Sequence, residues 1–165
     1  MKALILTLLF SLPVLAQNNF RAENGAIIWE KSFPAGSTDV AALLEAQSAI
    51  KIDMAVDNQV KGIAKELKIE GEGGTTLMKS NCNFDFDIAL EGDHYIVRVV
   101  NLKFLEKVGP LQMRTIVSSW EKYFMDNRKI RPTPITQGNL QYLDEFLSGV
   151  FSGTIITSSG AITAN

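Results

Sequence analysis

The stretch from Asn81 to Leu90, Asn-Cys-Asn-Phe-Asp-Phe-Asp-Ile-Ala-Leu, alternates apolar and polar side chains over ten residues. Five apolar side chains fall on one face: Cys82, Phe84, Phe86, Ile88 and Leu90. The other face carries Asn81, Asn83, Asp85, Asp87 and Ala89. A period of two is the pattern of a β-strand with one buried face. The stretch therefore predicts a strand around which an antiparallel sheet can be built.

A second apolar run, from Tyr95 to Leu105, follows this strand after a short polar segment. Gly92-Asp93 between two such runs is typical of a β-hairpin. A two-residue turn at this point predicts the opposed pairs Leu90 with Tyr95, Ile88 with Val97, Phe86 with Val99, Asp87 with Arg98 and Glu91 with His94. The apolar pairs all point to one face, which supports this register. Asn101 is expected to mark a bulge or the end of regular pairing.

The first 16 residues have the pattern of a secretory signal peptide. Lys2 supplies the positive charge, an apolar run covers residues 3–12, and small residues lead to Ala16. We expect cleavage before Gln17 and a protein that is periplasmic or secreted. A membrane anchor is the alternative, but the apolar run is shorter than the ~20 residues that a spanning helix needs. No other segment is long and apolar enough to predict a transmembrane span.

Charge and cysteine content narrow the classes of protein that the chain can represent. The chain has 16 basic and 18 acidic residues, and the expected mature part has a net charge of −3 because Lys2 is removed. This balance argues against nucleic-acid binding, which needs a basic surface. Cys82 is the single cysteine, so no internal disulfide can form. A mature part of about 150 residues is enough for one core, which we place at residues 26–153 between flexible segments 17–25 and 154–165.

The first half of this domain predicts three strands and a short helix. Strands are expected at residues 26–33, 50–56 and 60–69, with a bulge near Lys65 or Glu66 in the third. The helix is expected after an N-cap at Ser37 or Thr38, with Asp39 in its first turn and Val40, Leu43 and Leu44 on its buried side. Together with the hairpin, these elements predict an α+β fold with a sheet of about five strands and two or three helices.

The second half is expected to be largely helical. Helical spacing predicts an amphipathic helix over residues 111–126, with apolar positions Met113, Ile116, Val117, Trp120, Tyr123 and Phe124. The basic residues Arg128, Lys129 and Arg131 suit the C-terminal end of that helix. A last helix is expected from an N-cap at Asn139 to Gly153.

Few side chains suggest chemistry. His94, the only histidine, lies beside the hairpin turn, and Cys82 lies on the apolar face of its strand, where cysteine usually packs as a small hydrophobe. The row from Asn81 to Asp87 could hold a cation through its oxygens, but a straight strand does not wrap an ion as binding loops do. We therefore expect a solvated face with an Asp87–Arg98 pair. The sequence predicts no catalytic residue, metal site or cofactor.

Five short segments of the chain have a familiar pattern: residues 27–31, 95–99, 120–124, 128–131 and 143–147, or Ile-Ile-Trp-Glu-Lys, Tyr-Ile-Val-Arg-Val, Trp-Glu-Lys-Tyr-Phe, Arg-Lys-Ile-Arg and Leu-Asp-Glu-Phe-Leu. Together they resemble a family of exported bacterial proteins of unknown function that have a TATA-binding-protein-like fold. The resemblance implies a curved antiparallel sheet with helices on one face. It implies no activity, and the name of the fold does not imply DNA binding.

Two functions remain open. The first is a non-catalytic exported module that binds a protein, peptide or envelope component through the open face of the sheet or through a sheet edge. Its candidate contact residues are Ile96, Arg98, Val100, Asp85 and Asp87. The second is a carboxylate-based enzyme such as a glycan hydrolase, which would need two acids facing one another across a cleft. The sequence leaves the partner and the oligomeric state open.

Overall fold

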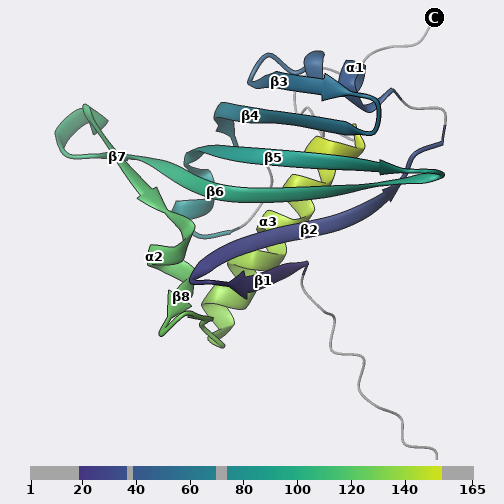
Figure 1. Ribbon diagram of the computed structural model, residues 1–165. Coiled ribbons are helices and arrows are strands. Elements are labelled where there is room, and N and C mark those ends of the chain that lie inside the picture. The colour runs from purple at the N-terminus through teal and green to yellow at the C-terminus, as the bar shows by residue number, and fades with distance from the viewer. Residues whose placement is uncertain (1–18, 37–38, 70–73, 154–165) are drawn as a thin grey trace, which may run out of the picture.

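A seven-stranded antiparallel sheet with helix α3 across one face forms the body of the protein (Figure 1). This computed structural model describes residues 19–36, 39–69 and 74–153. The predicted signal peptide, the predicted N-cap positions Ser37 and Thr38, residues 70–73 and the predicted C-terminal tail lie outside these residues. The strand order is β1-β2-β6-β5-β4-β3, and β7 pairs with β6. The α+β class and the antiparallel sheet are confirmed, with more strands than the five expected.

The strands are β1 (Phe20–Glu23), β2 (Ala26–Pro34), β3 (Ile50–Val56), β4 (Gln59–Lys68), β5 (Asn81–Glu91), β6 (His94–Val108) and β7 (Arg114–Ser119). A separate two-stranded sheet is formed by β8 (Met125–Asp126) and β9 (Lys129–Ile130). The helices are α1 (Val40–Glu45), α2 (Trp120–Phe124), α3 (Pro134–Ser152) and the short 3₁₀ turns η1 (Thr76–Lys79) and η2 (Pro110–Gln112). Strand β1 falls within residues 17–25, which the sequence predicted to be flexible, and its pairing with β2 corrects that expectation for residues 20–23.

The β5–β6 hairpin has the predicted register. The five predicted pairs from Phe86–Val99 to Glu91–His94 are all found. Gly92 lies in the turn with a φ of +62°, a conformation that glycine adopts without a side-chain clash. Asn101 is the predicted bulge, with a φ of +56°. Because one extra residue enters β6 here, the buried positions shift from odd to even numbers, and Leu102 and Phe104 face the core.

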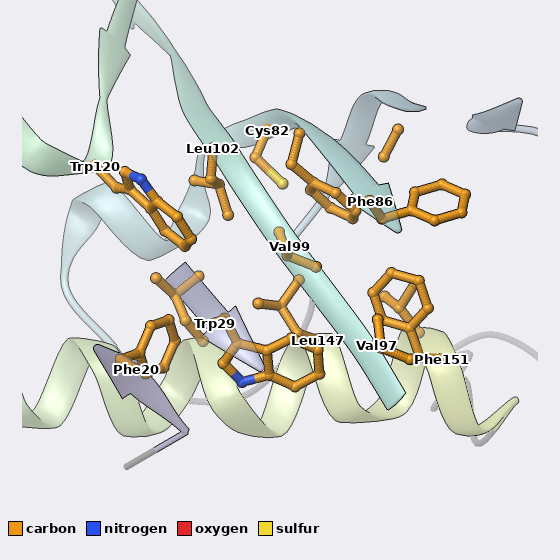
Figure 2. Close-up of a cluster of buried hydrophobic side chains, with 14 of the residues drawn as sticks. Phe20, Trp29, Cys82, Phe86, Val97, Val99, Leu102, Trp120, Leu147 and Phe151 are labelled. Atoms are coloured by element: carbon orange, nitrogen blue, oxygen red, sulfur yellow. The ribbon is translucent and has the colours of Figure 1, made fainter. Parts of the chain in front are cut away.

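The core lies between the sheet and α3 (Figure 2). Phe151 of α3 stacks on Trp29 of β2, with ring centroids 6.0 Å apart, and meets Phe86 of β5 edge-on at 5.5 Å. Helix α2 closes the other end, where Trp120 meets Phe20 of β1 edge-on at 6.0 Å. All three α-helices place buried side chains in this one cluster, so they cover one face of the sheet and leave the other open.

Helix α3 begins earlier than predicted. Its N-cap is Thr133, whose hydroxyl accepts a hydrogen bond from the Thr136 amide, and Pro134 occupies the first turn, where its missing N–H costs nothing. Asn139 is instead a buried position that accepts a hydrogen bond from the Thr75 hydroxyl at 3.1 Å. The predicted end is confirmed, because Gly153 is left-handed with a φ of +70°.

The predicted helix over residues 111–126 is wrong. Residues 114–119 form β7, and only Trp120–Phe124 is helical. Thr115, Ile116 and Val117 are β-branched and favour a strand, and β6 offers them an unpaired edge beyond the end of β2. Arg131 does serve the end of α2 as expected, since its guanidinium donates to the Tyr123 and Met125 carbonyls at 3.1 and 2.9 Å.

Three details of the first half also follow from local chemistry. The N-cap of α1 is Asp39, whose carboxylate accepts from the Ala42 amide at 3.1 Å, and not Ser37 or Thr38 as predicted. The predicted bulge of β4 is confirmed between Ala64 and Leu67, where Glu66 has a φ of +52°. Gly62 lies beneath the Phe86 ring, and a Cβ there would come within 2.6 Å of it, so this strand must lack a side chain at that point.

Candidate binding surfaces on the sheet

The face of the sheet opposite α3 carries a band of alternating charge. The register places Lys61 of β4 opposite Asp87 of β5, Asp87 opposite Arg98 of β6, and Arg98 opposite Glu30 of β2. Each of these positions lies on the polar side of its strand. The band continues onto β1, where Arg21 and Glu23 point to the same side.

Ion pairs within this band join neighbouring strands. Lys61 Nζ lies 3.0 Å from the Asp87 carboxylate, and Arg21 lies 2.9 Å from Glu30. The pKa of Glu30 is lowered, chiefly because its carboxylate accepts a hydrogen bond from Arg21, and the pKa of Arg21 is raised by the same bond. Since positive and negative groups alternate, the band concentrates neither sign of charge.

The five candidate contact residues all lie on this open face. Ile96 and Val100 are half-buried, and Arg98 and Asp85 are exposed. The expected Asp87–Arg98 ion pair is wrong, because Asp87 pairs with Lys61 and accepts from the Gln59 amide at 3.1 Å. The nearest acid to Arg98 is Glu23, at 3.9 Å. The structure brings the candidates together but gives most of their polar groups partners within the sheet.

The polar row on β5 has structural partners. Asp85 accepts a hydrogen bond of 2.7 Å from the side-chain amide of Asn101, at the β6 bulge. Asn83 accepts one of 2.7 Å from the Glu66 backbone amide, at the β4 bulge. Each side chain therefore supports an irregular point of the adjacent strand. Within residues 19–36, 39–69 and 74–153, no three His, Cys, Asp or Glu side chains lie close enough to hold a metal ion.

The two reactive side chains that the sequence singled out occupy different environments. Cys82 is fully buried, and burial raises the pKa of its thiol to about 12, so the prediction of a core role is confirmed. His94 lies beside the turn, where a ring nitrogen is 3.0 Å from the Asp93 carboxylate. That hydrogen bond raises the pKa of His94. Both His94 and Asp93 are at the surface.

Two carboxylates share a pocket of about 290 Å³ between α1 and the β3–β4 turn. Asp39 and Asp57 line this pocket together with apolar side chains such as Val40, Val56 and Leu90. Asp39 is already occupied as the N-cap of α1. One of the two carboxylates in this pocket is therefore committed to capping a helix.

The largest exposed apolar side chains lie elsewhere, on the hairpin of β6 and β7. Residues 105–117, here called the β6–β7 arm, run beyond the last pair of β5 with β6 at Asn81–Leu105 and project from the body at the left of Figure 1. Four side chains of the arm are exposed although they are large and apolar: Leu111 (89%), Met113 (82%), Ile116 (43%) and Val117 (57%). We call these four the arm hydrophobics.

The tip of the arm has an unusual backbone. Leu111 and Gln112 have φ values of +59° and +54°, after Gly109 at +84°. A left-handed conformation costs a residue with a side chain roughly 1–2 kcal/mol, and turns normally place Gly, Asn or Asp there. A leucine in this position, with its side chain in solvent, is a feature that folding alone does not favour.

Sequence reasoning missed this surface because the same residues fit a helix. Met113, Ile116 and Val117 were predicted to lie on the apolar face of a helix, which left the open face of the sheet as the best candidate. The signals that could have revealed the arm are the β-branched run at residues 115–117 and the Gly-Pro pair at residues 109–110. Together they describe a strand that returns after a turn.

The sequence matches no family model and no curated protein. Two solved structures resemble the chain in fold. A DUF4468 family protein from Bacteroides ovatus has a TM-score of 0.46 and 10% identity, over 87% of this chain and 92% of that one. A TBP-like protein from Parabacteroides distasonis has a TM-score of 0.47 and 11% identity, over 79% of this chain and 94% of that one. They agree with the resemblance drawn from the sequence, and at this identity they concern the fold alone.

Proposed function

We propose that the protein is an exported, non-catalytic binding module that engages a protein, peptide or envelope component through one outer edge of its sheet, the β6–β7 arm. The observation that carries the proposal is the arrangement of exposed apolar side chains. Four of the six large ones among the described residues belong to the arm hydrophobics. The other two, Val56 and Ile135, lie on separate elements. Large exposed apolar groups gathered at one place commonly mark an interaction site.

The arm is better suited to binding than the centre of the open face. Charges in the centre are compensated by their neighbours, and its apolar side chains Ile96 and Val100 are already half-buried. Among the strands that the structure describes, β7 pairs only with β6, so its outer edge offers backbone groups as well as side chains to a partner. We therefore favour the sheet edge over the open face as the contact surface.

Export is the second part of the proposal and rests on the sequence of residues 1–16. The product that accumulates outside the cytoplasm is expected to begin at Gln17, which N-terminal sequencing of that product measures. An intact Met1 or a lipid-modified terminus contradicts it. Within the described residues, no helix is both long and apolar enough to cross a membrane.

Cell fractionation tests the binding proposal. The share of protein held by the envelope is compared for the unchanged chain, for Leu111→Ser/Met113→Ser and for Ile135→Ser. Ile135 is the matched control because it is also large, apolar and 70% exposed, but lies on α3. The unchanged chain and the control are expected to stay with the envelope, and the double variant to be released. Equal retention of the two variants, or an unchanged chain that is wholly released, contradicts the proposal.

A further inference from the structure

We propose that the β6–β7 arm docks on an anionic lipid surface, with Leu111 and Met113 among the lipid headgroups and Lys107 and Arg114 beside the phosphates. This inference rests on the proposed function, because it names the envelope component that the arm would contact. It follows from three features of the arm: the position of its apolar side chains, the charge around them and the convex shape of its tip.

The apolar side chains lie where a surface would first meet the arm. Leu111 and Met113 are the two most exposed large hydrophobic residues among the described residues, at 89% and 82%. Leu111 lies within the turn that joins β6 to β7, and Met113 lies at its end. Ile116 and Val117 follow on β7, on opposite faces of the hairpin. The apolar surface therefore surrounds the end of the arm and is not a stripe that one neighbouring sheet could cover.

The charged side chains of the arm favour an anionic surface. Within the arm, Lys107 and Arg114 outnumber the single acid Glu106, and Lys103 lies just before the arm, whereas the whole chain has a net charge of −2. Lys103, Lys107 and Arg114 are exposed, and none of them makes an ion pair within the part of the chain that the structure describes. The acid, Glu106, accepts a hydrogen bond from the Tyr123 hydroxyl. Lys107 and Arg114 both lie nearer the turn than Glu106, so the arm has a net charge of +1, with its positive groups closest to the apolar tip.

The shape of the tip favours lipid over a protein. A stable protein interface buries about 800 Å² on each partner and needs a matching concave surface, whereas two side chains on a projecting turn offer far less. A bilayer deforms around a small apolar projection, and each nearby basic residue adds attraction to anionic lipid. A symmetric pairing of two arms would bring the basic residues of both copies together, which opposes a second copy as the occupant.

Vesicle sedimentation tests this inference. Protein is purified from cells that express the full chain, and its N-terminus is sequenced so that a retained leader is not mistaken for the arm. Binding is measured to phosphatidylcholine vesicles with and without 30–40% phosphatidylglycerol, an amount of about that order being enough to give a strongly negative surface. We expect binding only to the anionic vesicles, and weaker binding as salt is raised.

Matched variants assign the binding to the arm. Leu111→Ser/Met113→Ser is expected to weaken vesicle binding at least tenfold, and Ile135→Ser to leave it unchanged. Lys107→Gln/Arg114→Gln should weaken binding about fivefold for each charge removed. The control Lys65→Gln/Lys129→Gln removes two exposed basic residues from other strands and should have a much smaller effect. Unchanged binding by the first variant overturns the inference.

A reporter at the tip measures insertion directly. Both native tryptophans, Trp29 and Trp120, are fully buried. The difference in fluorescence emission between the Leu111→Trp variant and the unchanged protein therefore comes from the tryptophan at the tip. Anionic vesicles should shift this emission to the blue, and brominated lipids should quench it. An emission that anionic vesicles leave unchanged contradicts docking of the tip in lipid.

The outcomes separate this inference from the proposed function. If the double variant leaves the envelope in cells but the unchanged protein ignores anionic vesicles, the partner is a protein or another envelope component, and the lipid inference fails while the proposed function stands. If the unchanged protein is a dimer that Leu111→Ser/Met113→Ser makes monomeric, a second copy covers the arm and the lipid inference also fails. If the double variant changes neither envelope retention nor vesicle binding, both proposals fail.

Discussion

The indole Nε1 of Trp29 donates a hydrogen bond to the Asp144 carboxylate, with 2.7 Å between nitrogen and oxygen. The same oxygen accepts from the Asn19 side-chain amide at 2.6 Å, and the other oxygen lies 3.3 Å from Lys31 Nζ. One carboxylate on α3 thus joins the helix to β2 and to the residue before β1. It also allows an indole to be buried in the core with its N–H satisfied.

Removal of this carboxylate should destabilise the protein. Asp144→Ala leaves the buried Trp29 indole N–H without its acceptor and removes the ion pair of Lys31, which keeps the Ser148 hydroxyl as a partner. An unpaired buried polar group costs about 1–3 kcal/mol. We expect a loss of about 2–3 kcal/mol in urea unfolding. Glu145→Ala, at the exposed neighbouring position, is the control and should change stability by less than about 0.5 kcal/mol. Equal effects of the two substitutions would show that Asp144 is not a structural link.

The two faces of the sheet should respond differently to substitution. Phe86→Ala removes a buried ring that contacts Phe151 and should cost ~3–5 kcal/mol. Asp87→Ala removes a partly exposed ion pair and should cost no more than ~1 kcal/mol. Ile96→Asp places a charge on the open face, where it can reach water, and the fold should tolerate it. Unfolding by Ile96→Asp as severe as that by Phe86→Ala would mean that both faces are covered.

The buried thiol should be nearly inert in the native state. Because the pKa of Cys82 is raised to about 12 from an ordinary value of 9.0, very little thiolate forms at pH 8. A thiol reagent should therefore label native protein slowly and urea-unfolded protein quickly. The unfolded thiol ionises near pH 9 and the folded one does not, so the stability that the neutral thiol contributes is lost as the pH rises above 9. Cys82→Ser should flatten this part of the stability profile, whereas rapid labelling of native protein rejects a buried position.

The surface histidine should titrate above its ordinary pKa of 6.5, because the Asp93 carboxylate holds a hydrogen bond to the charged ring. NMR titration of the single histidine measures this value. Asp93→Asn removes the negative charge and should move the pKa of His94 back toward 6.5. A titration that Asp93→Asn leaves unchanged would show that the contact is not formed in solution.

At the tip of the arm, a substitution that raises the stability of the fold should weaken binding. Leu111→Asn places in the left-handed position a residue that tolerates it, so thermal stability should rise slightly, by up to about 1 kcal/mol. The same substitution removes an apolar side chain from the proposed contact and should weaken envelope retention. A loss of stability in Leu111→Asn would show that the leucine is kept for packing within the fold.

The hairpin could be predicted because its two determinants are local. Ten alternating residues define the buried face of β5, and a two-residue turn then admits one register that keeps Phe86 opposite Val99. The bulge at Asn101 could also be anticipated, because the apolar positions change parity after Val99. The register of this hairpin and its bulge depend on residues that are close together in the chain, so one sequence is enough to predict them.

The arm and the polar contacts could not be predicted because they depend on distant partners. Met113, Ile116 and Val117 fit a helical spacing as well as a strand, and the free edge of β6 decided between them. The charge band likewise needs the β2–β6 and β4–β5 registers, which bring Arg98 to Glu30 and Lys61 to Asp87. The sequence placed the candidate residues on the correct face of the sheet, but it predicted an Asp87–Arg98 ion pair where Asp87 pairs with Lys61.

The bulge at Asn101 divides β6 into two independently phased halves. Before it, odd-numbered residues face the helix and the strand pairs with β2; after it, even-numbered residues face the helix and the strand pairs with β7. Deletion of Asn101 would turn Phe104 toward solvent and Lys103 toward the core, so the bulge must be kept. Insertions or deletions beyond residue 105, in contrast, leave the phase of the first half unchanged. The arm can therefore lengthen, shorten or change its tip in the course of evolution while the body of the sheet stays as it is.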